Sequence, residues 1–441
     1  MKFKSEIELI DYTRGLIGKT FGEIDSKGLL NKQIGDKGVL GKVVETGHYG
    51  YTNNSIAEAD FNELGIELKV TGFEVSKKGL VTAKERLSLS MIDYIQIVNE
   101  EFEFSKMLFK NKKLLIIWYE YERGKEYADF QIKYFQIYDM CQDLEIIKND
   151  FYIIKRKVQE GKAHLLSEGD TSILGANTKG KSGAHKVQPY SKERAPSRGY
   201  CLKNSYMKGI LRNLHQDSAQ NNPPKYKTVI DYVMSHLSPY IGLTQAEIWF
   251  RLFGTDITLM TSLPKQLNKM ISDKILGKDE ELTRKDNLFT KTTFIIKNLP
   301  VKEIDNFPLE RLTFKNMSHS DFNLPWDEST WKTYYEEVTF IVIRFEGKKQ
   351  GERRLKDAVQ LSFNQDDLAT FEKSYNRIRE AIKLRDITLL PVPKSFSGQT
   401  LVIAPKGQKG AEAYKTFLES ETTKTSFMLE KNFIYKKFNE A

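Results

Sequence analysis

The sequence is poor in the residues and runs that mark several protein classes. Its 441 residues include only two cysteines, Cys141 and Cys201, too few for a structural zinc site and typical of a reducing compartment. The six histidines lack the H-x-x-x-H spacing of metal ligands. No apolar run approaches the roughly 20 residues of a membrane-spanning helix, and MKFKSEIELIDYTRG at the start lacks the apolar centre of a signal peptide. These absences predict a cytoplasmic protein without membrane contact.

Acidic residues are scarce in one part of the chain. The formal net charge is +9, and between Lys179 and Arg212 nine lysines and arginines accompany a single acid, Glu193, with three tyrosines among them: Tyr190, Tyr200 and Tyr206. A solvated, flexible loop is one interpretation. We favour a surface that neutralises phosphates and offers aromatic rings for base or sugar contacts, because so few acids are unusual for solubility alone.

Residues 175–182, GANTKGKS, match the phosphate-binding pattern G-x-x-x-x-G-K-[ST]. A true phosphate loop follows a buried strand and begins a helix, whose N-terminal amides hold the phosphates. Here the preceding stretch is only TSIL, and Gly183, Pro189, Pro196 and Gly199 prevent a long helix afterwards. We therefore predict no nucleotide binding and look for another role for this segment.

The chain contains a tandem repeat. Short matches recur in the same order in the two halves: 10–24 with 230–248, 63–73 with 292–301, 84–89 with 309–314, 114–124 with 339–347, 168–180 with 396–407, and 200–206 with 427–433. Their common order is stronger evidence than any single match. We expect a first domain over 1–214, a polar linker over 215–227 and a second, homologous domain over 228–441.

Each half predicts the same elements: a helical start, β-rich stretches such as LLIIWYEY and TFIVIRF, and a helix such as DLEIIKNDFYIIKRKVQEG. This order indicates an α+β fold with a central mixed sheet flanked by helices. In the second half the loop reads APKGQKG, with Lys406 in the place of Lys179. Both copies thus share a strand, a small-residue turn and a lysine, a common way of presenting lysine to guanine O6 and N7 in the major groove.

The segment ADFNELGIELKV carries Asp60, Glu67 and Lys69 in the spacing D-x₆-E-x-K. Two carboxylates and a backbone carbonyl can hold Mg²⁺, which polarises a phosphodiester and makes a water more acidic. On a strand Glu67 and Lys69 share a face, so Lys69 could orient the attacking water and offset phosphate charge. The pattern therefore predicts phosphodiester hydrolysis.

Alone, this motif is weak. A solvated strand edge would show the same residues. Asp150, Glu160 and Lys162 also match the loose pattern, but in a helical stretch where residues two apart do not share a face. We expect this second match to have no function.

Further residues give the motif a context. DKGVLGKVVETGHYG (36–50) and SIAEADFNELGIELKV (55–70) resemble the signature of the MutH family of mismatch-repair endonucleases and of its restriction-enzyme relatives that cut GATC. In that family a helix beginning D-K-G carries a glutamate, and S-x₄-D-F-x₂-L-G-[IV]-E-L-K follows. The resemblance extends through TAKERLSL, LSEGDTSILGANTKG and YCLKNSYMKGIL, nearly the whole first domain. The two-domain build resembles type II restriction endonucleases with a second MutH-like copy.

The resemblance implies a Mg²⁺-dependent endonuclease in which water attacks phosphorus directly, without a covalent enzyme intermediate. It places Glu45, Asp60, Glu67 and Lys69 at catalytic positions, with the three carboxylates and the Leu68 carbonyl as metal ligands. The partners it implies are double-stranded DNA, with two recognition sites in the functional complex, and a cognate DNA methyltransferase that protects host DNA. The enzyme would act as a monomer or a DNA-induced dimer.

The resemblance also implies DNA-binding positions. Lys179 would read bases, and the family's Arg-Pro before this lysine is replaced by Asn177 and Thr178. Tyr200 falls at a position beside the adenine of the site. The remaining DNA contacts that it implies are Thr178, Gly180, Lys37, Arg86 and Lys203.

The second domain departs from the catalytic pattern. Aligning Lys297 with Lys69 puts Ile295 at the position of Glu67, and isoleucine cannot ligate Mg²⁺. We expect this domain to bind effector DNA through Lys406 without cutting; decay to a remnant is the alternative. For the whole chain the alternatives are a strand-nicking mismatch-repair endonuclease and a non-catalytic DNA-binding regulator. The fused second domain argues against the first, and a motif intact in only one copy argues against the second.

Overall fold

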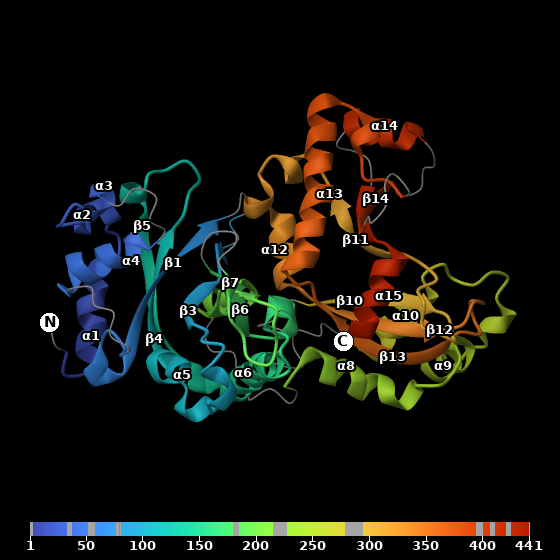
Figure 1. Ribbon diagram of the computed structural model, residues 1–441, viewed down its shortest axis with the longest axis horizontal. Helices are drawn as coiled ribbons and strands as arrows, with labels where there is room; N and C mark the ends of the chain where they lie inside the picture. The colour runs from blue at the N-terminus through green and yellow to red at the C-terminus, as the bar shows by residue number, and fades with distance from the viewer. Residues whose placement is uncertain are drawn as a thin grey trace. The chain divides into compact units, whose positions relative to one another are not determined.

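The chain divides into two compact units (Figure 1). The first comprises Met1–Leu166 and Thr171–Lys227, and the second comprises Ser167–Asp170, Thr228–Phe289 and Thr293–Ala441. The computed structural model describes residues 3–32, 38–51, 58–75, 79, 81–179, 185–214, 227–277, 294–393, 400–405, 411–419 and 425–440.

The main division falls between Lys227 and Thr228, at the end of the predicted linker, whose residues 215–226 lie outside the described ranges. The assignment of Ser167–Asp170 to the second unit was not predicted. Across the ranges given above, no helix combines the length and the apolarity that crossing a membrane requires.

A mixed four-stranded sheet forms the centre of the first unit, in the order β2-β1-β4-β5. β1 (Ile66–Val75) and β4 (Lys113–Glu120) run parallel, while β2 (Val81–Ala83) and β5 (Gln131–Asp139) pair antiparallel at the two edges. The chain passes from β1 to its parallel neighbour through β3 and α5 (Lys106–Asn111), as a parallel pair requires a long connection. Against the sheet pack short N-terminal helices: α1 (Glu6–Thr13), α2 (Phe21–Ile24), α3 (Leu29–Lys32) and α4 (Val39–Val43).

A second, antiparallel sheet completes this unit in the order β3-β9-β6: β3 (Leu87–Met91), β9 (Arg198–Leu202) and β6 (Leu174–Thr178). The helices that follow or precede these strands are α6 (Leu144–Gln159) and α7 (Asn204–Asn213), and β7 (His185–Lys186) pairs with β8 (Ala195–Pro196). Because Gly175–Thr178 are strand residues of β6, half of GANTKGKS is not a loop at all. This agrees with the rejection of a phosphate loop.

The second unit has a three-stranded mixed sheet and an antiparallel sheet that resemble those of the first. β10 (Phe294–Val301) is parallel to β12 (Thr339–Glu346), which pairs antiparallel with β13 (Arg354–Leu361). The antiparallel sheet has the order β11-β15-β14: β11 (Leu312–Met317), β15 (Thr425–Leu429) and β14 (Leu401–Pro405). The predicted α+β class with mixed sheets and flanking helices is confirmed.

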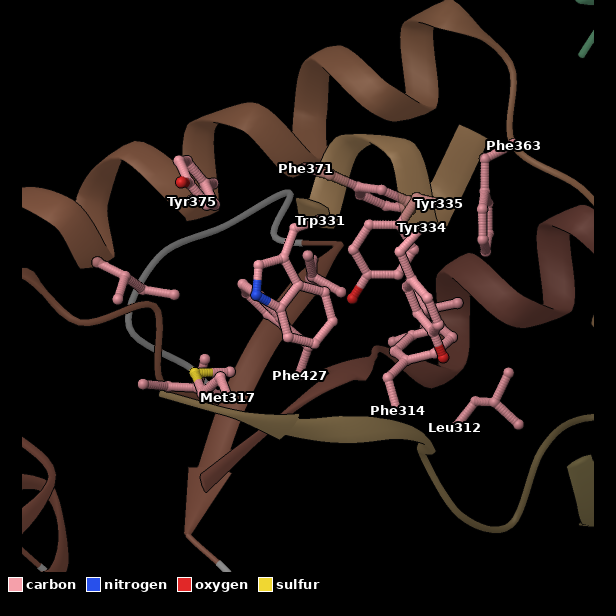
Figure 2. Close-up of a cluster of buried hydrophobic side chains, with 14 of the residues drawn as sticks. Leu312, Phe314, Met317, Trp331, Tyr334, Tyr335, Phe363, Phe371, Tyr375 and Phe427 are labelled. Atoms are coloured by element: carbon pink, nitrogen blue, oxygen red, sulfur yellow. The ribbon is translucent and has the colours of Figure 1, made fainter. Parts of the chain in front are cut away.

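Helices surround these strands: α8 (Val229–Leu237), α9 (Gln245–Phe253), α10 (Leu267–Ile275), α12 (Thr330–Glu337), α13 (Gln365–Leu384), α14 (Ala411–Glu419) and α15 (Lys431–Glu440). Figure 2 shows the core of this unit, where Trp331 and Tyr335 of α12 meet Phe371 of α13 and Phe427 of β15. The rings of Trp331 and Phe427 meet edge to face, 4.8 Å between centroids. Aromatic packing of this kind joins the helix layer to the antiparallel sheet.

Small features of the backbone recur at corresponding places in the two units. Thr20 and Thr244 each close a capping box at the start of α2 and α9. Two residues before each threonine is a glycine, Gly18 or Gly242, with φ of 86° or 84°, a region that favours glycine. The amide of Gly18 donates to the Ile132 carbonyl and that of Gly242 to the Leu355 carbonyl, both at 2.8 Å. Ile132 and Leu355 are therefore equivalent.

Candidate active site

A tight turn before β1 brings Asp60 beside Glu67. Residues 62–64 form a single 3₁₀ turn that ends at Gly65, which has φ of 63°. The chain then reverses, so that Phe61 pairs with Ile66. The Asp60 amide donates to Glu67 Oε2 (3.2 Å), and the Leu68 amide donates to Asp60 Oδ2 (2.9 Å). The D-x₆-E spacing is thus the length of this turn.

Glu67 is buried in the sheet, only 3% exposed, on the central strand β1. Lys69 lies on the same strand face, and its Nζ is 2.8 Å from Glu67 Oε1. The solvated-edge interpretation is therefore wrong for these two residues. Lys110, near the end of α5, places a second ammonium 3.5 Å from the same oxygen.

Lys110 was not found from the sequence. Lys110 lies 43 residues after Glu67 in the sequence. Only the parallel pairing of β1 with β4, which begins directly after α5, brings them together. A lysine-rich helix end, FKNKK, is its one sequence signal, and this signal is common on protein surfaces.

Three carboxylates influence one another at this end of β1. Burial, together with the charges of Glu67 and Glu45, raises the pKa of Asp60 to about 6, against the lowering effect of the Leu68 hydrogen bond. Burial, followed by the Glu67 charge, also raises the pKa of Glu45, which lies in the π-helical turn Val44–His48 after α4. The fold therefore gathers the predicted carboxylates, together with Lys69, in one region.

The chemistry of these donors fits Mg²⁺, because carboxylate oxygens are its preferred protein ligands and a divalent cation would offset charge crowded enough to raise two pKa values. Their present arrangement is not a closed ligand set: in the part of the chain that is described, no three acidic, histidine or cysteine side chains converge closely enough to hold a metal ion. Glu67 is instead paired with two lysines.

Lys179 lies close to this region. It follows β6, and its amide donates to the Ser197 carbonyl (2.7 Å), continuing the pairing with β9. Burial lowers its pKa, and the charges of Arg86 and Lys69 lower it further. The lysine predicted to read bases and the lysine of the acidic motif are thus near enough to interact electrostatically.

The other predicted DNA contacts have mixed placements. Thr178, the last residue of β6, and Arg86, just before β3, are half-buried and lie near Lys179 in the chain or in space. Gly180, Lys37 and Lys406 lie outside the described residues.

Two predicted contacts point into the protein. Tyr200 is only 3% exposed and its ring stacks on Phe151 of α6, with 5.9 Å between centroids. Lys203 is 1% exposed, and its ammonium donates to the Thr171 carbonyl beside the buried Asp150. Strand alternation explains why the Tyr200 side chain points away from Lys179: successive residues of β9 face opposite sides of the sheet, and the next residue, Cys201, is the one near Lys179. Neither side chain is placed to contact DNA in this structure, which corrects both predictions.

The basic stretch as a whole is less exposed than the sequence indicates. Arg198 is 1% exposed and donates to the carbonyls of Ala176 and Leu166. Tyr206 is fully buried and hydrogen-bonds to Asp143. Among its three tyrosines only Tyr190 is open to solvent, at 73%. The predicted phosphate-neutralising surface is therefore confined to part of the stretch, because β9 and α7 belong to the core.

The register of the strands identifies what replaces Glu67 in the second unit. Ile132 pairs with Tyr119, and its equivalent Leu355 pairs with Phe345. Five residues earlier on β4 and β12 are Leu114 and Phe340, which pair across the parallel ladder with Glu67 and Ile295 respectively. By strand register, Ile295 thus corresponds to Glu67 and Lys297 to Lys69.

Lys297 has a backbone carbonyl and an aromatic ring among its neighbours. Its Nζ donates to the Thr313 carbonyl (2.6 Å) and lies 5.6 Å from the centre of the Phe314 ring. The lysine of the first unit instead faces a carboxylate. Residues equivalent to Asp60 precede β10 and lie outside the described ranges.

The first unit contains a segment that resembles the MutH family. Residues 49–150 match the model of the family described as DNA mismatch repair enzyme MutH, and they include Asp60, Glu67 and Lys69. Over 367 residues the chain is 29% identical to a type II restriction enzyme, Sau3AI of Staphylococcus aureus, covering 77% of this chain and 74% of that protein.

The chain is also 26% identical over 226 residues to the DNA mismatch repair protein MutH of Vibrio campbellii (strain ATCC BAA-1116), covering 49% of this chain and 97% of that protein. The mismatch-repair protein thus corresponds to about half of the chain, while the restriction enzyme matches over most of it. These similarities confirm the predicted resemblance to MutH-like type II restriction endonucleases.

Proposed function

We propose that the protein is a Mg²⁺-dependent type II restriction endonuclease that cuts double-stranded DNA at a short site, GATC by resemblance. The observation that supports it most is the meeting of Glu45, Asp60, Glu67 and Lys69 around the start of β1 in a MutH-like unit. A cognate DNA methyltransferase that protects host DNA belongs to the same proposal.

In this mechanism Asp60, Glu67, Glu45 and the Leu68 carbonyl would hold the metal. Bound Mg²⁺ would polarise the scissile phosphate and lower the pKa of a water. Lys69 is on the face of β1 that carries Glu67, where its ammonium can orient the attacking water and offset charge on the phosphate. Lys110, 3.5 Å from the same Glu67 oxygen, would add a second positive charge for the phosphate.

Incubation of the purified protein with plasmid and Mg²⁺ separates this proposal from its alternatives. A restriction endonuclease gives fixed fragments, a strand-nicking repair endonuclease gives open circles, and a DNA-binding regulator leaves the plasmid intact. Sequencing the ends of the fragments then identifies the site.

Lys179→Ala is expected to weaken binding to the cognate duplex much more than binding to a random duplex, by about 1–3 kcal/mol of discrimination. The reason is that base-edge contacts carry sequence information, whereas a phosphate contact would weaken both duplexes alike and lower the salt dependence. Dissociation constants for both duplexes, measured without metal, decide between these roles. Added ATP should change neither binding nor cleavage.

We propose that the second unit is an effector domain that binds DNA without cutting it. Ile295 removes a carboxylate there, while the fold around the strand is retained. Two recognition sites on one plasmid raise the effective concentration of the second contact, and one complete active site per chain requires two passes or two chains to cut both strands.

This second proposal predicts faster cleavage of two-site than of one-site plasmid, stimulation of one-site cleavage by a short cognate duplex, and loss of both effects in Lys406→Ala. Initial rates on the two plasmids provide the measurement. Equal rates that do not respond to the duplex would leave the second unit with a structural role only.

A further inference from the structure

The side chain of Lys179 lies in a slot on the antiparallel sheet of the first unit. Gly199 of β9 forms one wall: a Cβ on this residue would be 3.0 Å from Lys179 Cε and 3.1 Å from the Ser90 carbonyl oxygen. Both distances are shorter than ordinary van der Waals contact. Gly199 is not among the glycines with positive φ. The position therefore favours glycine because a side chain there would crowd Lys179, and not because of its backbone conformation.

The end of the lysine is held by polar groups on both sides of the slot. Its ammonium donates to the Ser88 hydroxyl of β3. With the Asn177 amide oriented so that its nitrogen donates to the Gly199 carbonyl (2.8 Å), the Asn177 oxygen accepts from Lys179 Nζ at 3.2 Å. Ser88 is exposed, so the slot opens to solvent at the ammonium end. The three strands of the sheet therefore fix a side chain that is ordinarily flexible.

The described strands of the second unit differ from the first at the position of Gly199. Leu87 pairs with Leu202 and Leu312 with Leu429, and each ladder then has a register shift that leads to Met91 opposite Gly199 and to Asn316 opposite Ser426. Ser426 is thus the equivalent of Gly199. Its side chain is fully buried, and its hydroxyl donates to Asn316 Oδ1 (3.0 Å). A side chain and its hydrogen bond therefore fill the space that the lysine stem uses in the first unit.

We propose that Gly199 and Ser88 are positioning residues that hold Lys179 ready to read a base, and that this device belongs to the first unit alone. The inference rests on the proposed DNA recognition by Lys179. A long ammonium side chain has many rotamers in solution, and one held in place loses less freedom when it binds an acceptor pair. In the free protein the Ser88 hydroxyl accepts a hydrogen bond from the Lys179 ammonium. On DNA binding, guanine O6 and N7 would replace this hydroxyl as acceptors.

The test compares Gly199→Ala and Ser88→Ala with the unmodified protein. Each variant is expected to lower the ratio of cognate to random duplex affinity by about tenfold, most of it as weaker cognate binding. Ser88→Thr keeps the hydroxyl, as Thr313 does at the equivalent position, and should retain the ratio. Ser191→Ala, which removes a hydroxyl that accepts from the Glu193 amide (3.1 Å) instead, serves as the matched control.

The outcomes separate this proposal from the recognition role itself. If Lys179→Ala lowers the ratio while Gly199→Ala and Ser88→Ala leave it unchanged, the slot has no positioning role. If Lys179→Ala also leaves the ratio unchanged, the recognition role fails. Should Gly199→Ala lower the unfolding temperature, Ser88→Ala decides, because Ser88 is exposed and its loss leaves no cavity.

Discussion

Glu67→Gln is expected to lower the rate of plasmid cleavage on the order of a thousandfold or more, because a carboxylate that holds a metal contributes several kcal/mol to the transition state. Glutamine has the same shape and can still accept the Asp60 amide hydrogen bond. It removes the negative charge that pairs with Lys69 and Lys110. Binding to the cognate duplex without metal should remain largely intact, so the loss is one of chemistry.

Lys69→Ala should reduce cleavage in the same way. The matched control is Glu160→Gln, since Glu160 belongs to the false motif and forms only a surface ion pair with Lys162 at 3.1 Å. Initial rates of supercoiled plasmid loss under Mg²⁺ measure all three variants. A Glu67→Gln enzyme that cuts at a normal rate would show that the active site lies elsewhere.

Asp150→Ala is expected to destabilise the first unit by about 3–5 kcal/mol. Asp150 is fully buried in α6, and its carboxylate accepts the amides of Ser172, Ile173 and Leu174 at 2.6–2.9 Å. Lys203 stabilises the charged form of the carboxylate against the burial that raises its pKa to about 6. Alanine would leave three donors without an acceptor and Lys203 without its counter-charge.

Urea unfolding followed by far-UV circular dichroism would measure this loss. Glu160→Ala is the control: its ion pair is at the surface, where such pairs contribute about 0–1 kcal/mol. An Asp150→Ala protein of normal stability would mean that water replaces the carboxylate. The second match to the acidic pattern therefore has a structural role after all, although only for its aspartate.

The sequence predicted well what depends on local pattern. Alternation along β1 placed Glu67 and Lys69 on one face, and the ordered matches between the halves predicted a mixed sheet in each half. It failed where tertiary contacts decide. Basic residues in a row predicted a surface, but Lys203 is turned inward by Asp150, which is distant in the chain. The sequence did not predict the contact of Lys110 with Glu67, because only the parallel strand pairing places the two residues side by side.

Glu67 and Ile295 stand at corresponding strand positions, and they differ in what they contribute to catalysis and to the stability of the fold. A buried carboxylate is costly in the folded state even with two ammonium groups nearby, whereas an isoleucine at the same place packs on the apolar core of its unit. The first unit therefore carries a local folding cost that the second has lost. A domain that does not catalyse can have an apolar residue at that position, which lowers the free energy of its folded state. The more stable strand would then support a role that needs only binding.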